Sequence, residues 1–294
     1  MKPSYIHGLE KIALLGPTAV DHFSVLPDGS QTFVCAGGVC RNIALDLWAL
    51  GLDPTLMTQN YADSLASIGI STPTELDQRF IETPSHHVGW LAQYDVKFDG
   101  VDVVEDSSDY EYSQLIFTET VAIELAPALT EFDVIISCTD VSEGFWFNLP
   151  RSMNQCLVTS GMPLPVRYLD WLLRCYSLFI NRDEAASIDL TPMELCREAK
   201  KRGVKQAIVT MGKDGGVYYL DDTGEPRRAV AIASNEIISP VGAGDALVAG
   251  VIFGLSQKYS LEQSIEFGLK MATLKLSHQG SAFTQKLNLD LELY

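Results

Sequence analysis

The chain has 294 residues, of which 47% are hydrophobic and 20% are charged. These proportions are typical of a folded globular protein and argue against a disordered or fibrous chain. The 38 acidic residues outnumber the 21 basic ones, which gives a formal net charge of -17. Such a charge repels phosphate backbones and anionic lipids, so we expect neither nucleic acid nor a membrane surface as a partner.

We expect no membrane span or secretory signal. The first apolar run, residues 12–20, is short and is interrupted by Gly16 and Pro17. The six cysteines are scattered without a C-x-x-C pair, which predicts buried thiols in a reducing cytoplasm and no disulfide or zinc site. They are Cys35, Cys40, Cys138, Cys156, Cys175 and Cys196.

Apolar runs of strand length alternate with longer segments of helical period along most of the chain. This alternation predicts the α/β class, with a sheet built from βαβ units. The expected strands are Lys11–Leu15, Pro54–Met57, Val134–Cys138, Gln155–Val158, Ser177–Ile180 and Gln206–Val209. The expected helices are Arg41–Leu50, which ends before Gly51, together with Ala243–Leu255 and Leu261–Leu276.

Two segments break the alternation. Residues 20–36 and about 86–112 contain short strand-like runs around the turn residues Pro27-Asp28-Gly29 and Asp99-Gly100. They predict a small antiparallel β flap beside the main sheet, and an ordinary hairpin edge is the alternative. Without a linker or internal repeat, residues 1–294 are expected to form one domain.

The most informative motif is a small-residue turn that leads into an apolar helix, Gly242-Ala243-Gly244-Asp245. Glycines let backbone N–H groups approach an anion, and a helix N-terminus adds partial positive charge. Asp245 in the first turn is then placed to accept a proton from a hydroxyl. This combination suggests phosphoryl transfer, and a surface turn with a dipole-complementing acid is the alternative.

Two further motifs suit a polar ligand. Gly37-Gly38 precede a helix that carries Asn42, whose side chain offers both a donor and an acceptor to hydroxyl groups. Asn42 is equally suited to helix capping. Asp21 follows the first expected strand, where ligands of open α/β sheets collect, although an isolated aspartate there is commonly a turn residue.

The order and spacing of these motifs resemble the ribokinase-like (PfkB) carbohydrate kinase family over nearly the whole chain. The matching segments are Gly16–Asp21, Gly37-Gly38 with Asn42, Asn181–Glu184, Thr210–Gly212 with Gly215, and Gly242–Asp245. Within the family, residues 37–44 and Ser239 are most similar to pseudouridine kinases. The resemblance implies a central, mainly parallel sheet flanked by helices, and a β lid that also forms a homodimer.

The resemblance also implies a role for each matching residue. Asp245 is the base, and Gly242, Ala243 and Gly244 supply backbone donors to the transferred phosphoryl group. Asp21, Gly37, Gly38 and Asn42 hold the substrate. ATP is expected at Asn181, Thr210, Gly212, Gly215, Gly242 and Gly244, with adenine near Lys270–Leu274. Asn181 and Glu184 are expected to organise Mg²⁺, largely through water. A helix-start asparagine with an exposed acid is the alternative for this last pair.

Several positions depart from the family pattern. Ser239-Pro240 replace an Asp-Thr that helps to coordinate a monovalent cation in many relatives. We therefore expect no potassium dependence through that carboxylate, and cation binding by the backbone carbonyls is the alternative. Cys138-Thr139-Asp140, Thr159–Pro163 and Asn60–Asp63 also differ from the usual residues near the substrate.

The resulting hypothesis is an ATP-dependent kinase that phosphorylates a primary hydroxyl of a nucleoside or sugar, with pseudouridine as the specific candidate. A ribokinase- or fructokinase-type sugar kinase and a non-catalytic nucleoside-binding relative are the alternatives.

Overall fold

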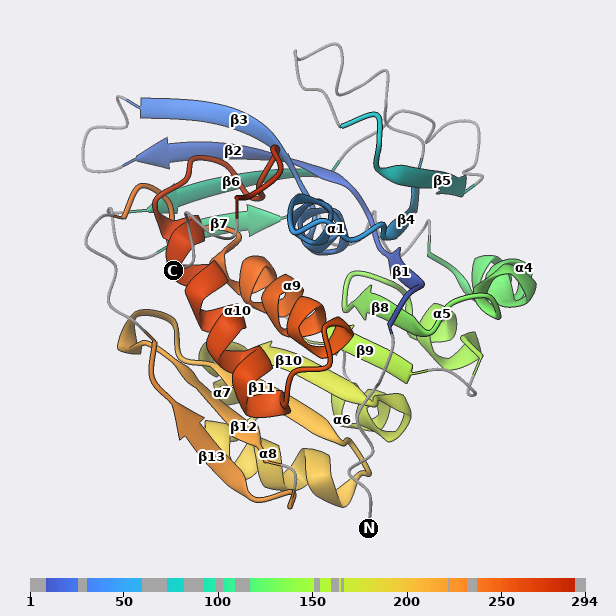
Figure 1. Cartoon of the computed structure of the whole chain (residues 1–294). Coiled ribbons are helices and arrows are strands. Elements are labelled where there is room, and N and C mark those ends of the chain that lie inside the picture. The colour runs from blue at the N-terminus through green and yellow to red at the C-terminus, as the bar shows by residue number, and fades with distance from the viewer. Residues whose placement is uncertain are drawn as a thin grey trace.

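Two β-sheets organise the part of the chain that the structure describes (Figure 1). This computed structural model describes residues 9–25, 31–59, 73–81, 92–98, 103–108, 117–150, 154–159, 164, 167–221, 223–231 and 237–288. The larger sheet has nine strands and the smaller has four.

The larger sheet has the strand order β13-β12-β11-β10-β9-β8-β1-β4-β5. The seven strands from β11 to β5 run parallel, and β12 and β13 are added antiparallel at one edge. All six predicted strands are present within two residues of their expected ends. The strands are β1 Ile12–Leu15, β4 Thr55–Gln59, β5 Asp77–Ile81, β8 Val134–Cys138, β9 Asn154–Val158, β10 Ser177–Asn181, β11 Gln206–Thr210, β12 Val217–Leu220 and β13 Pro226–Ala229.

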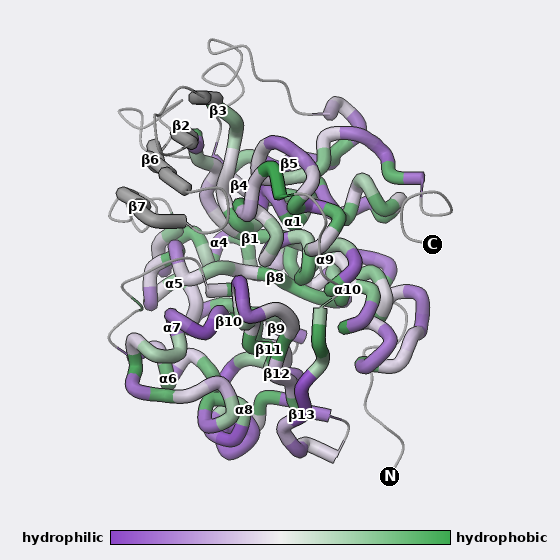
Figure 2. Tube along the Cα trace, turned by 90° about the vertical axis from the view of Figure 1, so that its left-hand side faces the viewer, coloured by the Kyte–Doolittle hydropathy of each residue, from purple (hydrophilic) through white to green (hydrophobic). Residues whose placement is uncertain are grey.

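Helices cover both faces of this sheet (Figure 2). Alternate residues of β1 enter two separate cores: Ile12 and Leu14 pack with α1, α9 and α10, whereas Ala13 and Leu15 pack with the helices of the opposite face. Because parallel strands are buried on both faces, they appear in the sequence as continuous apolar runs, which is why they were predictable.

The helices begin and end at recognisable signals. Asn181, Thr191 and Ser260 each cap a helix through a capping box with the acid or amide three residues later. None of the described helices is long and apolar enough to cross a membrane. The helices are α1 Val39–Ala49, α4 Glu119–Leu129, α5 Glu143–Asn148, α6 Tyr168–Trp171, α7 Arg182–Ala186, α8 Pro192–Lys201, α9 Ala243–Ser256 and α10 Leu261–Leu276, with 3-10 turns η2 Leu172–Arg174 and η3 Gly212–Asp214.

The smaller sheet corresponds to the predicted flap. It has the order β3-β2-β6-β7 and consists of β2 Ala19–Val25, β3 Gln31–Gly37, β6 Ala92–Phe98 and β7 Val103–Ser108. The prediction of an antiparallel flap was wrong at its centre: two antiparallel hairpins meet there through a parallel pairing of β2 with β6. A sequence pattern reveals which strands share a turn, but it does not reveal how two hairpins associate. The predicted turns at residues 27–29 and 99–100, and residues 86–91 and 109–112, lie outside the described residues.

The smaller sheet is attached to the larger one through residues 16–18. Thr18 donates its backbone N–H to Oε1 of Gln59 at 3.1 Å, and Nε2 of Gln59 donates to the Thr18 carbonyl at 2.7 Å. The Thr18 hydroxyl also lies 3.1 Å from that of Thr58. All three side chains are buried, so the end of β4 holds the start of the smaller sheet firmly.

The strand order reverses next to β1. The chain passes from β1 to β4 and β5 on one side, and β8 then returns to pair with β1 on the other side. Ligands of open α/β sheets bind outside the carboxyl ends of the strands at such a point. The site is therefore expected where residues 16–18 leave β1 and residues 139–140 leave β8.

Candidate active site

Asp245 and Asn42 lie together at the starts of two helices. Asp245 is in the first turn of α9, and Asn42 is in the first turn of α1. Nδ2 of Asn42 donates to Oδ2 of Asp245 at 2.8 Å. Asn42 is buried, and within the described residues its Oδ1 has no hydrogen-bond partner. Helix capping therefore does not account for Asn42, because Gly38 is the N-cap residue of α1.

The Asp245 carboxyl group is tuned towards neutral pH. Burial raises the pKa of Asp245 to about 7, and the negative charges of Asp21 and Asp140 act in the same direction. The hydrogen bond from Asn42 and the charge of Lys275 lower the pKa. A carboxyl group with a pKa near the working pH is suited to general base catalysis.

The turn before α9 leaves backbone donors available to an anion. Gly242 is the N-cap residue with a left-handed φ of 78°, and Ala243 N–H donates to the Pro240 carbonyl at 3.3 Å. The next two N–H groups, of Gly244 and Asp245, have no acceptor among the described residues. A Cβ added at Gly244 would meet no atom within 4 Å. The turn therefore combines free donors, a helix N-terminus and open space, as an anion site requires.

The Asp21 carboxylate lies against the second glycine motif. A Cβ at Gly37 would lie 2.1 Å from Oδ2 of Asp21, and a Cβ at Gly38, where φ is 99°, would lie 2.4 Å from the Pro17 carbonyl oxygen. Gly38 therefore requires glycine, whereas a side chain at Gly37 would displace the Asp21 carboxylate. Asp21 also accepts a hydrogen bond of 2.5 Å from the hydroxyl of Ser281. The structure thus brings Asp21, Gly37 and Gly38 together, and the charge of Asp21 influences Asp245.

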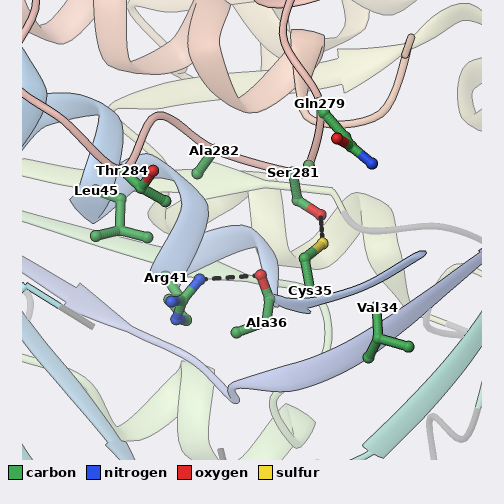
Figure 3. Close-up of a pocket in the computed structure, with 10 residues that line it drawn as sticks. Val34, Cys35, Ala36, Arg41, Leu45, Gln279, Ser281, Ala282 and Thr284 are labelled. Atoms are coloured by element: carbon green, nitrogen blue, oxygen red, sulfur yellow. Dashed lines mark hydrogen bonds between the residues drawn. The ribbon is translucent and has the colours of Figure 1, made fainter. Parts of the chain in front are cut away.

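A cavity of about 320 Å³ lies between β3, the start of α1 and the segment after α10 (Figure 3). Cys35 Sγ lies 3.2 Å from the Ser281 hydroxyl in its wall, and Nη1 of Arg41 donates to the Ala36 carbonyl at 3.0 Å. Asp245 does not line this cavity. Ser281 nevertheless connects the cavity wall to Asp21.

Asn181 and Glu184 form a capping box at the carboxyl end of β10. Oδ1 of Asn181 accepts from the Glu184 backbone N–H at 2.7 Å, and Oε2 of Glu184 accepts from the Asn181 N–H at 2.9 Å. Oε2 also accepts a short hydrogen bond from the Thr159 hydroxyl. Glu184 is buried, so the alternative of an exposed acid does not hold.

These two residues offer the oxygen donors that Mg²⁺ prefers, but the capping box engages both of them. They fit a magnesium ion that is held through water better than one bound directly. Among the described residues, no three histidine, cysteine or acidic side chains form a direct metal cluster.

The other residues expected near ATP follow the neighbouring strand. Thr210 ends β11 in register with Asn181, and η3 follows directly. Gly212 and Gly215 adopt left-handed backbone angles, with φ of 54° and 66°. The most crowded glycine here is Gly216, which the sequence analysis did not select: its Cβ would lie 2.1 Å from the Ala229 carbonyl oxygen. An ion pair between Arg182 and Asp214 joins η3 to α7.

Sequence reasoning missed several site residues. Asp140 was noted only as a departure, yet it is buried at the end of β8 and its charge raises the pKa of Asp245. Ser281 and Asp46 belong to no motif, because their partners Asp21 and Phe283 lie more than 200 residues away in the sequence. Lys275 binds carbonyls only three and five residues further along, but no recognised motif contains it. Of the departing segments, residues 60–63 and 160–163 lie outside the described residues, whereas Thr139 and Thr159 are buried.

Comparisons with known proteins show what this chain is similar to. The model of the pfkB family carbohydrate kinases matches residues 152–287. The ATP-dependent 6-phosphofructokinase of Thermoanaerobacterium thermosaccharolyticum is 32% identical over 91 residues, which is 31% of this chain and only 27% of that protein. The guanosine-inosine kinase of Exiguobacterium acetylicum is 25% identical over 298 residues, covering 90% of this chain and 93% of the relative.

Solved structures define the fold. The Arabidopsis thaliana ribokinase complexed with ribose and ATP superposes with a TM-score of 0.68 at 16% identity, covering 92% of this chain and 94% of the ribokinase. The class is therefore the ribokinase fold, with a mostly parallel central sheet flanked by helices, as predicted. The chain is therefore similar to the pfkB family carbohydrate kinases over residues 152–287, and it has the ribokinase fold. The two relatives named above are a 6-phosphofructokinase and a guanosine-inosine kinase.

Proposed function

We propose that this protein is an ATP-dependent kinase that transfers the γ-phosphoryl group of ATP to a primary hydroxyl of a nucleoside or a sugar. The observation that carries the proposal is the Asp245 carboxyl group, which has a pKa of about 7 and lies beside the free N–H groups at the start of α9. Pseudouridine is the specific substrate that we propose, and ribose- or fructose-type sugars are the competing candidates.

In this proposal Asp245 removes the proton from the acceptor hydroxyl. Asn42 holds the carboxyl group through the 2.8 Å hydrogen bond to Oδ2, which leaves Oδ1 to face the acceptor. The free backbone N–H groups of Gly244 and Asp245 stabilise the negative charge that develops on the transferred phosphoryl group. Gly242 shapes the turn, and the Ala243 N–H, which was also expected to be a donor, is bound to the Pro240 carbonyl. Preorganised donors of this kind each contribute roughly 3–4 kcal/mol in well-studied enzymes.

The nucleotide side of the site is proposed along β10 and β11. Thr210, Gly212 and Gly215 bind the ATP phosphates, and Asn181 and Glu184 hold Mg²⁺ through water. Bound there, Mg²⁺ neutralises phosphate charge. The substrate side is formed by Asp21, Gly37, Gly38 and Asn42. A buried aspartate and an amide with an unused oxygen suit the hydroxyl groups of a ribose ring better than an apolar substrate.

The test is a coupled assay of ADP release from purified protein with MgATP and one acceptor at a time: pseudouridine, uridine, guanosine, inosine, ribose or fructose. Asp245→Asn is the matched control for contaminating kinases. Turnover with pseudouridine supports the specific proposal, and turnover with ribose or fructose alone contradicts it. If no acceptor is phosphorylated and wild type equals Asp245→Asn throughout, the kinase assignment is wrong.

A non-catalytic nucleoside-binding protein is the second candidate, favoured by the unusual residues Thr139 and Thr159 in the buried part of the site. It predicts that a nucleoside raises the melting temperature of wild type and of Asp245→Asn equally, without turnover.

Pairing of two lids in a homodimer and a cytoplasmic location also remain proposals. Light scattering during size-exclusion chromatography tests the former, and the six free cysteines support the latter.

A further inference from the structure

The segment after α10, residues 277–284, runs between the two halves of the proposed site; we refer to it as the strap. Its Ser281 hydroxyl donates to Asp21 at 2.5 Å. The Ser281 carbonyl oxygen lies where a Cβ of Gly242 would be, 1.8 Å from that position. The strap therefore contacts both the Asp21 carboxylate and the turn before α9. Its position determines the distance between Asp21 and that turn.

A buried lysine holds the strap from inside. Lys275, in the last turn of α10, is 0% exposed. Its Nζ donates to the His278 carbonyl at 3.1 Å and makes a shorter hydrogen bond to the Gly280 carbonyl. Two backbone carbonyls around one positive charge are the kind of ligand set that potassium channels offer to K⁺. Here that set is filled by an ammonium group of the chain itself.

The surrounding charges explain how a lysine is tolerated there. Asp46 of α1 is also 0% exposed; its Oδ1 accepts from the Phe283 backbone N–H at 2.8 Å, and its Oδ2 has no partner among the described residues. Burial lowers the pKa of Lys275, whereas the carboxylates of Asp46 and Asp245 raise it. Burial also raises the pKa of Asp46, and the charge of Lys275 acts in the opposite direction. An isolated buried charge is costly, so this ammonium group and these acids stabilise one another.

The residues present do not fit a separate monovalent cation at this place. Ser239 brings a hydroxyl instead of a carboxylate, and that hydroxyl accepts from the Val241 N–H at 3.3 Å. The carbonyls of His278 and Gly280, which otherwise remain as ligands, are bound by Lys275. A bound cation and the Lys275 ammonium group would also repel each other at such short range.

We propose that the Lys275 ammonium group replaces a bound monovalent cation: it holds the strap against Asp21 and Gly242, so that the kinase needs no K⁺. Lys275 is a positioning residue, because it acts through Ser281 and the turn before α9. This inference rests on the proposed kinase function for its activity readout, whereas its structural consequence can be measured without any turnover.

The experiment compares wild type with Lys275→Ala, which leaves a hole, and Lys275→Met, which fills the space without charge. Lys201→Ala on α8, with an exposed side chain, is the control variant. Each protein is assayed in choline chloride, then with added NaCl, KCl, NH₄Cl or methylammonium chloride. Melting temperature and hydrogen exchange of residues 277–284 are recorded under the same conditions.

We expect the wild-type rate to differ by less than about twofold between choline and K⁺. The rates of both Lys275 variants in choline should be about 100-fold lower than that of wild type, which is the loss expected when reacting groups are displaced by about 1 Å. NH₄⁺, K⁺ or methylammonium should restore the rate of Lys275→Ala in a saturable way and leave the rate of Lys275→Met unchanged. Because Lys275 lowers the pKa of Asp245, the residual activity of Lys275→Met should need a higher pH. A purely structural lysine predicts neither the rescue nor this shift.

Activation of wild type by K⁺ of tenfold or more would overturn the proposal, as would Lys275→Ala with the wild-type rate. If wild type has no kinase activity, the proposed function fails, but the Lys275 proposal is still tested: saturable stabilisation of Lys275→Ala and renewed protection of the strap by NH₄⁺ support it, and their absence contradicts it. If both variants fail to fold, the response of wild type to K⁺ tests the proposal: independence of K⁺ supports it, and activation of tenfold or more contradicts it.

Discussion

At the scale of single residues, the proposed chemistry depends on one carboxyl group. Replacing Asp245 by Asn keeps the shape and removes the base, so we expect kcat to fall roughly 10²–10⁴-fold. Steady-state kinetics at pH 8 measures this change. Because the native pKa of Asp245 is raised, ionising it costs stability as the pH rises towards 7. The melting temperature of Asp245→Asn at pH 8 should therefore equal or exceed that of wild type, and a large decrease would show that the lost activity reflects unfolding.

The same carboxyl group sets a pH dependence. Since Asp245 must be ionised to act as a base, kcat/KM should rise with pH through an apparent pKa near 7. The hydrogen bond from Asn42 lowers that pKa, so Asn42→Ala should move the rise to higher pH. A profile of Asn42→Ala that is identical to wild type would contradict the assigned contact, and Lys201→Ala is the control.

At the scale of an element, the turn before α9 contains one glycine that is tightly packed, Gly242, and one that faces open space, Gly244. Gly242→Ala adds a Cβ 1.8 Å from the Ser281 carbonyl at a left-handed φ, so we expect a loss of about 1–3 kcal/mol in the free energy of unfolding. Gly244→Ala adds a Cβ in open space and should change that free energy by no more than about 0.5 kcal/mol. Urea denaturation of both variants measures the difference.

Activity should not follow stability in this pair. In Gly244→Ala the new methyl group enters the space proposed for the phosphoryl group, and we expect kcat to fall between about 10- and 100-fold through misplacement of the reacting atoms. Gly244→Ala with the wild-type rate would show that the phosphoryl group does not bind at this turn.

The elements also show what the sequence could predict. Strands such as Val134–Cys138 and the helix Leu261–Leu276 were predicted to the residue, because buried parallel strands and amphipathic helices have clear periods. The glycine motifs were found because a backbone turn constrains local sequence. The β2–β6 pairing and the contacts of the strap were not predicted, because they join segments that are far apart in the sequence. Ser281 and Asp21, for example, are 260 residues apart, and no local pattern indicates their contact.

At the scale of the whole molecule, the net charge of -17 opposes both compactness and the approach of MgATP. Raising the ionic strength from about 0.01 to about 0.15 M shortens the Debye length from about 30 to about 8 Å. We therefore expect the melting temperature to rise and the KM for ATP to fall over this range in choline chloride, which avoids specific alkali-cation effects. Differential scanning fluorimetry and initial rates measure the two changes, and a decrease in melting temperature would mean that surface ion pairs dominate.

The buried contact of Thr18 with Gln59 has a consequence for how the two sheets move. Because this reciprocal pair fixes the backbone up to residue 18, any swing of the smaller sheet that preserves it must turn about the bonds that follow. Asp21 lies beyond those bonds, but the 2.5 Å hydrogen bond from Ser281 also ties it to the strap. A swing that carries Asp21 away from α1 and α9 must therefore break this second attachment or take the strap with it.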